Sequence, residues 1–266
     1  MKRTLIVGNW KMNLDTAAAS LLLHRLDKRI KSHQEVEVVL APSMLVLQPL
    51  SLQIDRHKFR LAAQNAFYKD EGAYTGEVSF TMLQDLVHYA IIGHSERRVY
   101  FKEDLETVRD KVAAAIRNDI SPILCVGETK QEKLQGETKQ VLHDQVTTAL
   151  SNLTSEDIEK VVLVYEPQWT ITSFKGRPAK PDEAESAIKH IRLQVEHLYG
   201  EKVSKEIRVL YGGSVDSDTV GGYLQIDGCD GVLVGSASLN YQKFGDIVDV
   251  AHRQREPKKE AKSGKK

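Results

Sequence analysis

The sequence has only two cysteines, Cys125 and Cys229, in 266 residues. Two thiols cannot form the disulfide framework that stabilises small secreted domains, and scarce cysteine is typical of a reducing compartment. Long hydrophobic runs are also missing. The first apolar run, residues 5–7, is too short for the hydrophobic region of a signal peptide, and no later run could span a bilayer. We therefore expect a cytoplasmic protein with no membrane contact.

Neither sign of charge is in excess, because 37 basic residues balance 37 acidic ones. The net field therefore gives no reason to expect nucleic acid as a partner, and any anionic ligand must be held by local donors.

Residues 253–266 depart from this balance of charge, with seven basic residues, two acidic ones and no large apolar side chain. Such a segment has nothing to bury. We expect a disordered tail beyond a folded domain of residues 1–252.

Eight short apolar runs recur along that domain, and most are too continuously apolar for half-exposed strands, as in a parallel sheet covered on both faces. They comprise residues 4–7, 36–40, 60–63, 89–92, 122–126, 161–165, 207–211 and 231–234. Helical patterns lie between them. Asp15 is placed to cap a helix reaching about Ser32, apolar stripes mark helices around residues 108–116 and 141–150, and Pro181 starts one that ends near Gly200.

Eight alternations of strand and helix with right-handed crossovers close most economically as a single (β/α)8 barrel, an α/β fold. An open doubly wound sheet is the alternative. It predicts a Gly-x-Gly-x-x-Gly turn after the first strand, where this chain has Gly8-Asn9-Trp10-Lys11.

Chemically capable side chains follow several predicted strands. Asn9 and Lys11 follow the first, His94 and Glu96 the fourth, and Glu166 the sixth. Each residue alone is better explained as a surface or turn residue. In a closed barrel, however, all five lie at one mouth, where such folds carry their active sites.

Two glycine turns follow the last two strands. They contain Gly213 and Ser214 after the seventh strand, and Gly235 and Ser236 after the eighth. Glycine lets backbone N–H groups crowd around an anion, and phosphate sites recur at these two strand ends of the barrel. Either turn alone is a weak signal, but together they predict a phosphate site.

The strand-end motifs together resemble the triosephosphate isomerase family, in order from about residue 4 to residue 250. The motifs are Asn9-Trp10-Lys11-Met12-Asn13, Ala62-Ala63-Gln64-Asn65, Gly72-Ala73-Tyr74-Thr75-Gly76-Glu77, Gly93-His94-Ser95-Glu96-Arg97-Arg98, Cys125-Val126-Gly127-Glu128-Thr129, Tyr165-Glu166-Pro167 and Tyr211-Gly212-Gly213-Ser214-Val215. The resemblance implies a TIM barrel enzyme of glycolysis and gluconeogenesis. Its reaction would interconvert dihydroxyacetone phosphate and D-glyceraldehyde 3-phosphate through an enediolate, with neither metal nor organic cofactor.

The resemblance also implies residue roles. Glu166 would be the base, and His94 the electrophile, a neutral imidazole at the start of a helix whose positive end disfavours protonation. Lys11 and Asn9 would stabilise charge on the substrate oxygens, while Glu96 would orient Lys11.

The phosphate would bind Ser214 and the backbones of Thr172, Gly213, Gly235 and Ser236, the last replacing a usual glycine. The loop of residues 67–77, with Tyr74, Thr75 and Glu77, resembles the family's dimer loop. It implies a homodimer in which this loop inserts beside the active site of a second copy.

The lid after Glu166 departs from the family. Where the family usually has Ala-Ile-Gly-Thr-Gly-Lys, this chain has Thr170-Ile171-Thr172-Ser173-Phe174-Lys175, and the stretch before Pro181 is about two residues longer. Losing both glycines predicts altered closure. It leaves open a sugar-phosphate-binding protein with impaired catalysis, or a scaffold without ligand. Retention of Lys11, His94 and Glu166 favours the enzyme.

Overall fold

The computed structural model describes residues 2–171 and 177–255, and its eight parallel strands close into one barrel in chain order. The strands are β1 (Thr4–Asn9), β2 (Val36–Ala41), β3 (Phe59–Ala63), β4 (Tyr89–Ile92), β5 (Ser121–Val126), β6 (Val162–Tyr165), β7 (Arg208–Tyr211) and β8 (Gly231–Val234). Because β8 pairs with β1 as well as β7, the sheet has no open edge. The predicted (β/α)8 barrel is therefore confirmed, and the doubly wound alternative is wrong.

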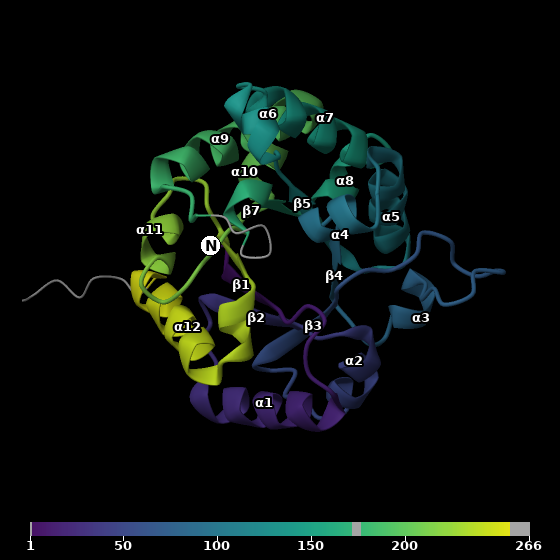
Figure 1. Cartoon of the computed structure of the whole chain (residues 1–266), viewed down its shortest axis with the longest axis vertical. Coiled ribbons are helices and arrows are strands. Elements are labelled where there is room, and N and C mark those ends of the chain that lie inside the picture. The colour runs from purple at the N-terminus through teal and green to yellow at the C-terminus, as the bar shows by residue number, and fades with distance from the viewer. Residues whose placement is uncertain (1, 172–176, 256–266) are drawn as a thin grey trace, which may run out of the picture.

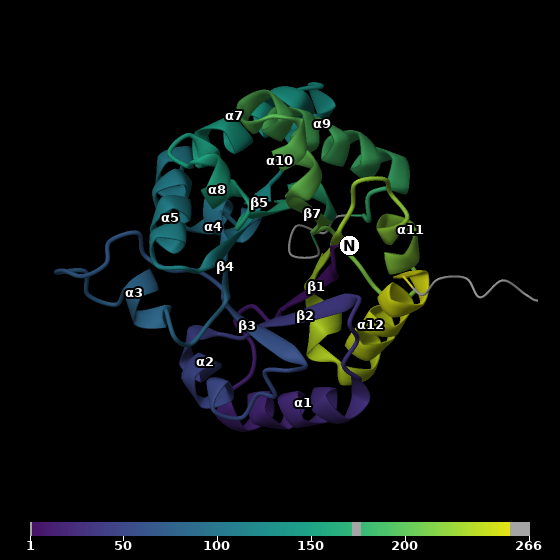
Figure 2. The same ribbon diagram turned by 180° about the vertical axis from the view of Figure 1, so that it is seen from behind.

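Helices surround the strands in a ring in both views along the barrel (Figures 1 and 2). They are α1 (Thr16–Arg29), α2 (Met44–Ser51), α3 (Phe80–Leu83), α4 (Ser95–Tyr100), α5 (Leu105–Arg117), α6 (Lys130–Leu134), α7 (Thr138–Leu150), α8 (Ser155–Ile158), α9 (Pro181–Tyr199), α10 (Glu201–Glu206), α11 (Val220–Leu224) and α12 (Tyr241–Arg255), with 3-10 turns η1 (Gln168–Thr170) and η3 (Ser236–Leu239).

Strand side chains alternate between two apolar layers. In β1, Leu5 and Val7 point into the barrel interior, where Val39, Cys125 and Leu210 also lie. The intervening residues face the ring of helices and belong to the larger outer core. Burial on both faces explains why the strands read as continuous apolar runs.

Closure of the barrel depends on one glycine. Gly231 begins β8 and pairs with Leu5 of β1. A Cβ atom at Gly231 would overlap the carbonyl oxygen of Leu5. Only glycine lets the last strand approach the first this closely.

Local signals set several helix ends. Asp15 Oδ1 accepts a hydrogen bond from Ala18 N–H at 2.8 Å and caps α1 as predicted, although α1 ends at Arg29 and not near Ser32.

The last helix, α12, extends into the segment predicted to be a disordered tail. Because α12 continues through Arg255, the first three residues of the predicted tail of residues 253–266 are helical. The remainder of that tail, residues 256–266, lies outside the described residues.

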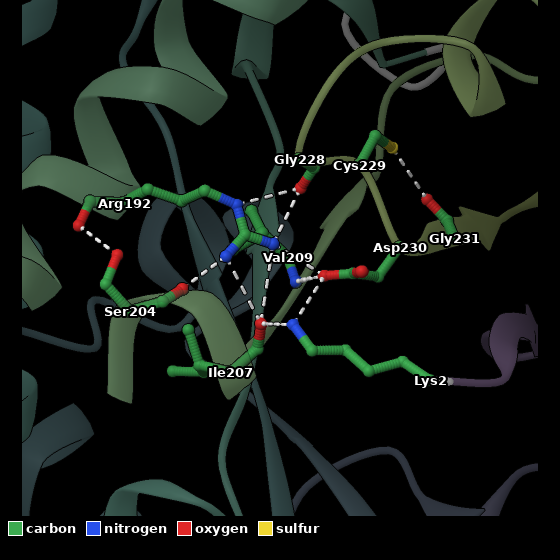
Figure 3. A network of polar contacts seen from close by, with 9 residues as sticks. All are labelled: Lys2, Arg192, Ser204, Ile207, Val209, Gly228, Cys229, Asp230 and Gly231. Carbon is green, nitrogen blue, oxygen red and sulfur yellow. Dashed lines mark hydrogen bonds and ion pairs between the residues drawn. The ribbon is translucent and has the colours of Figure 1, made fainter. Parts of the chain in front are cut away.

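A polar network ties together the amino-terminal ends of β7 and β8 (Figure 3). Arg192 of α9 donates to the backbone carbonyls of Ser204, Ile207 and Gly228, and pairs with Asp230 at 2.6 Å. Lys2 donates to the same Ile207 carbonyl at 2.9 Å. One guanidinium therefore fixes the two loops that lead into the last two strands.

None of the described helices is both long enough and apolar enough to cross a membrane.

Candidate active site

The carboxyl ends of the strands surround one cavity of about 360 Å³. Its size lies in the range of small-ligand pockets. The predicted site residues that line it are Lys11, His94, Glu166, Gly213, Ser214, Gly235 and Ser236. Barrel closure thus brings together side chains that are up to 225 positions apart in the sequence, from Lys11 to Ser236.

Lys11 is held by its own neighbours. Its backbone has φ 53°, an uncommon left-handed conformation, and its N–H donates to Asn9 Oδ1 at 3.1 Å. The Gln64 amide donates to the Lys11 carbonyl at 2.9 Å. The Lys11 ammonium group donates to Glu96 Oε1 at 2.7 Å. Asn9 and Glu96 therefore fix the backbone and the charged end of Lys11, respectively.

His94 is the N-terminal cap of α4, and this position determines its tautomer. Its Nδ1 atom accepts a hydrogen bond from Glu96 N–H at 3.2 Å, so Nδ1 carries a lone pair and no proton. The ring proton of the neutral imidazole is then on Nε2. That atom lies 2.8 Å from Glu166 Oε1.

Glu166 is a buried carboxylate at the end of β6, with 3% of its surface exposed. Its Oε1 atom lies beside His94 Nε2, and its Oε2 atom accepts a hydrogen bond from Ser95 N–H at 2.8 Å. A Cβ atom on Gly127 would overlap the Glu166 backbone, and one on Gly212 would overlap the Val164 side chain in β6. The close packing of Gly127 fixes where the Glu166 backbone, and hence its carboxylate, projects.

The glycine turn after β7 is equally crowded. A Cβ atom on Gly213 would overlap the Tyr211 hydroxyl, so only glycine fits. Ser214 Oγ donates to the Thr170 carbonyl at 2.7 Å, which ties this turn to η1. After β8, Gly235 and Ser236 begin η3, and Gly235 lies beside the Lys11 side chain. The predicted phosphate contact at Thr172 lies outside the described residues.

Several residues of the site were not predicted as such. Arg98 donates to the Gly93 and Cys125 carbonyls and joins the ends of β4 and β5. The Cys125 thiol lies behind Glu166, and burial, followed by the Glu166 charge, raises its pKa well above the usual value. Lys243 of α12 lines the cavity as a second cation. In the sequence it reads as an ordinary surface lysine, so no local pattern could have revealed it.

A buried carboxylate lies beside this site. Glu128 is fully buried and accepts hydrogen bonds from Tyr165 Oη at 3.1 Å and Trp169 Nε1 at 2.9 Å. These contacts hold η1 against the carboxyl end of β5. The sequence motif contained Glu128, but nothing in its spacing pointed to these partners.

The predicted dimer loop projects away from the barrel between β3 and α3 (Figure 1). Tyr74 is 44% exposed, and Thr75 and Glu77 are also at the surface. These three residues thus lie apart from the cavity of their own chain.

Within residues 2–171 and 177–255, no group of three or more His, Cys, Asp or Glu side chains is arranged to hold a metal ion.

Comparison with known proteins agrees with this geometry. The family model described as triosephosphate isomerase matches residues 4–251. The chain is 42% identical over 250 residues to "Triosephosphate isomerase" of Caldanaerobacter subterraneus subsp. tengcongensis, covering 94% of this chain and 100% of the relative. It is 42% identical over 253 residues to that of Chloroherpeton thalassium (94% and 100%), and 41% identical over 250 residues to that of Clostridium tetani (94% and 97%). The chain belongs to the triosephosphate isomerase family.

Proposed function

We propose that this enzyme interconverts dihydroxyacetone phosphate and D-glyceraldehyde 3-phosphate with Glu166 as its base. The substrates follow from the family. The observation that supports the roles is the 2.8 Å contact between Glu166 Oε1 and His94 Nε2, in the same cavity as two glycine turns. A proton acceptor and a proton donor are therefore adjacent, close to donors for an anion.

Glu166 removes a proton from the carbon next to the substrate carbonyl and returns it to the neighbouring carbon. Between the two steps the carbonyl oxygen carries the charge of an enediolate, and a proton passes from the substrate hydroxyl oxygen to this oxygen, so that the former hydroxyl becomes the new carbonyl. His94 donates a hydrogen bond from Nε2 to the substrate oxygens as a neutral imidazole. Because Glu166 Oε1 lies 2.8 Å from His94 Nε2 in this structure, the carboxylate must move away from His94 before either group can act on the substrate.

Lys11 stabilises the same developing negative charge with its ammonium group. Glu96 orients that group through the 2.7 Å contact, and Asn9 holds the Lys11 backbone. The amide nitrogen of Asn9 adds a donor toward the substrate oxygens.

The phosphate group binds at the turns after β7 and β8. Backbone N–H groups of Gly213, Ser214, Gly235 and Ser236 bind its oxygens, as glycine turns commonly do. A further contact from Thr172 remains a prediction.

We also propose a cytoplasmic homodimer. Large apolar side chains are exposed in the segments that follow β1, β2, β3 and β4: Met12 is 95% exposed, Leu45 75%, Met82 65% and Phe101 65%. Exposed apolar side chains on this part of the barrel favour an interaction surface. The projecting loop with Tyr74 suits insertion into a second copy. Both cysteines are free and buried, which suits a reducing compartment.

A coupled assay with purified protein tests the function in both directions. We expect interconversion that saturates with substrate and needs no added metal or cofactor. Binding of triose phosphates without turnover would instead support the alternative of a sugar-phosphate-binding protein. No observation favours that alternative, because Lys11, His94 and Glu166 all remain at the cavity.

A further inference from the structure

Tyr223 of α11 lies behind the proposed phosphate site. Its hydroxyl donates to the Ala179 carbonyl at 2.7 Å, and its ring stacks on Tyr211 with centroids 4.0 Å apart. Both tyrosines are buried, with 2% and 0% of their surfaces exposed. A buried tyrosine hydroxyl requires a partner, and here the partner belongs to the segment just before α9.

The other backbone group of Ala179 is also held. Its N–H donates to Tyr211 Oη at 3.4 Å. The stacked tyrosines therefore make hydrogen bonds with both backbone polar groups of Ala179. We name Tyr211, Tyr223 and Ala179 the tyrosine clasp. The residue before Ala179, Pro178, lines the cavity. The clasp thus fixes one wall of the phosphate site.

The clasp also supports a second part of the cavity wall. The Tyr211 hydroxyl lies so close beneath Gly213 that any Cβ atom there would overlap it. Gly213 and the adjacent Ser214 line the cavity. The position of the Tyr211 ring therefore sets the position of this turn, and Tyr223 packs against that ring.

We propose that Tyr223 is a positioning residue for the substrate phosphate, holding Pro178 and the turn at Gly213 in their binding geometry through the tyrosine clasp. The inference rests on the proposed function, since it assigns the phosphate to this turn. Groups held before binding lose less freedom when the ligand arrives. Tyr223 therefore acts on phosphate binding and leaves the carbon chemistry at Glu166 unchanged.

Tyr223→Phe is the direct test, because it removes one hydroxyl and keeps the stacked ring. The matched control is Tyr199→Phe. Tyr199 also donates to a backbone carbonyl, that of Leu150, at the far end of α9. Both variants lose a tyrosine-to-carbonyl hydrogen bond, so both should lower the melting temperature. If Tyr223→Phe does not fold, Tyr223→Met replaces it, since methionine adapts to irregular core space.

We expect Tyr223→Phe to raise KM for glyceraldehyde 3-phosphate and Kd for inorganic phosphate about fivefold, the factor that one typical net hydrogen bond represents. The rate constant for deuterium uptake by phosphate-free glyceraldehyde should not change. Tyr199→Phe should keep both KM and Kd at the wild-type values.

A Tyr223→Phe variant that is less stable but keeps the wild-type KM and Kd would overturn the proposal, and so would equal changes in both variants. An equal loss of reaction rate with glyceraldehyde and with glyceraldehyde 3-phosphate would also overturn the proposal. Tyr223 would then affect the proton transfer at Glu166 and not phosphate binding alone. A failure of the proposed function would give a different result from a failure of this inference. The wild-type protein itself would then lack turnover, and the Kd values for inorganic phosphate would still test the tyrosine clasp.

Discussion

At the scale of single residues, one backbone hydrogen bond decides what His94 can do. Because Nδ1 accepts the N–H of Glu96, the ring proton is left on Nε2, which points at Glu166. A neutral imidazole with its proton on that side can donate to a substrate oxygen. In the proposed mechanism, the cap of a short helix thus sets the tautomer of His94 before any substrate arrives.

Lys11→Met should abolish measurable isomerisation and leave the melting temperature nearly unchanged. In the proposed mechanism the ammonium group stabilises charge that exists only on the reacting substrate, and the Lys11 side chain is 28% exposed, so it contributes little to the core. Steady-state kinetics and thermal unfolding measure the two effects.

Lys28→Met, at the exposed end of α1, is the control and should retain full activity. A fall of the melting temperature by many degrees in Lys11→Met would show instead that Lys11 has a structural role.

At the scale of elements, the start of α9 depends on Glu183. Its carboxylate accepts hydrogen bonds from both terminal nitrogens of Arg177 and from Lys180 N–H, and pairs with Lys133 at 3.1 Å. The Arg177 guanidinium is the main cause that lowers the pKa of Glu183 from 4.5 to about 2. The helix beside the cavity is therefore fixed by an ionised carboxylate.

The stabilisation by Glu183 should depend on pH in a defined direction. A carboxyl group with a lowered pKa in the folded state stabilises fully above its unfolded value, 4.5, and this contribution is lost as the pH falls toward 2. Glu183→Gln should therefore cost about 1 to 2 kcal/mol at pH 6, since the exposed Arg177 partner weakens the pair, and almost nothing near pH 2.

Urea unfolding at pH 6, 4 and 3 measures this difference, with Glu185→Gln, an exposed neighbour on α9, as the control. A stability difference for Glu183→Gln that is the same at all three pH values would contradict the assignment.

The elements that the sequence predicted best are those with a local signal. All eight strands were predicted within two residues at each end, because continuous burial makes each strand a short apolar run. The end of α1 was wrong by about three residues. Ile30 adopts an extended backbone and is buried, so packing and not local preference ends that helix.

The site was predictable only where its residues follow strand ends. The cavity brings His94 and Glu166 together as the resemblance implied, yet Lys243 and Tyr223 lie on helices whose sequence carries no chemical signal. Their positions depend on how helices pack around the barrel. The predicted phosphate contact at Thr172 and the central part of the altered lid, residues 172–176, lie outside the described residues and stay predictions.

At the scale of the whole molecule, one end of the barrel carries the candidate active site and the other end carries contacts that stabilise the fold. The carboxyl ends of the strands carry the cavity, whereas the Arg192 network holds the loops at the amino ends (Figure 3). Arg192→Met should lower the free energy of unfolding by about 3 kcal/mol, because it leaves the buried Asp230 without its main partner. The kcat at 25 °C should not change.

Chemical unfolding and steady-state kinetics measure the two quantities. Lys160→Met, which breaks an exposed pair with Asp119, should cost less than about 1 kcal/mol. A large loss of kcat in folded Arg192→Met would mean that the two ends of the barrel are coupled.

The proposed dimer predicts that activity depends on protein concentration. If the loop with Tyr74 completes the site of a second copy, dilution should lower specific activity as dimers dissociate. Sedimentation velocity at the assay concentrations measures the assembly in parallel. A fully active monomer would rule out this arrangement.

Isomerisation in D₂O tests the central claim most directly, that Glu166 moves a proton between two carbons. A proton held by a carboxylic acid exchanges with solvent, so glyceraldehyde 3-phosphate formed from dihydroxyacetone phosphate should carry deuterium at C2 in its NMR spectrum. Glu166→Gln should slow this reaction by about 10² to 10⁴, the usual contribution of a positioned base. Product without deuterium, or a Glu166→Gln variant with near-normal turnover, would contradict the account.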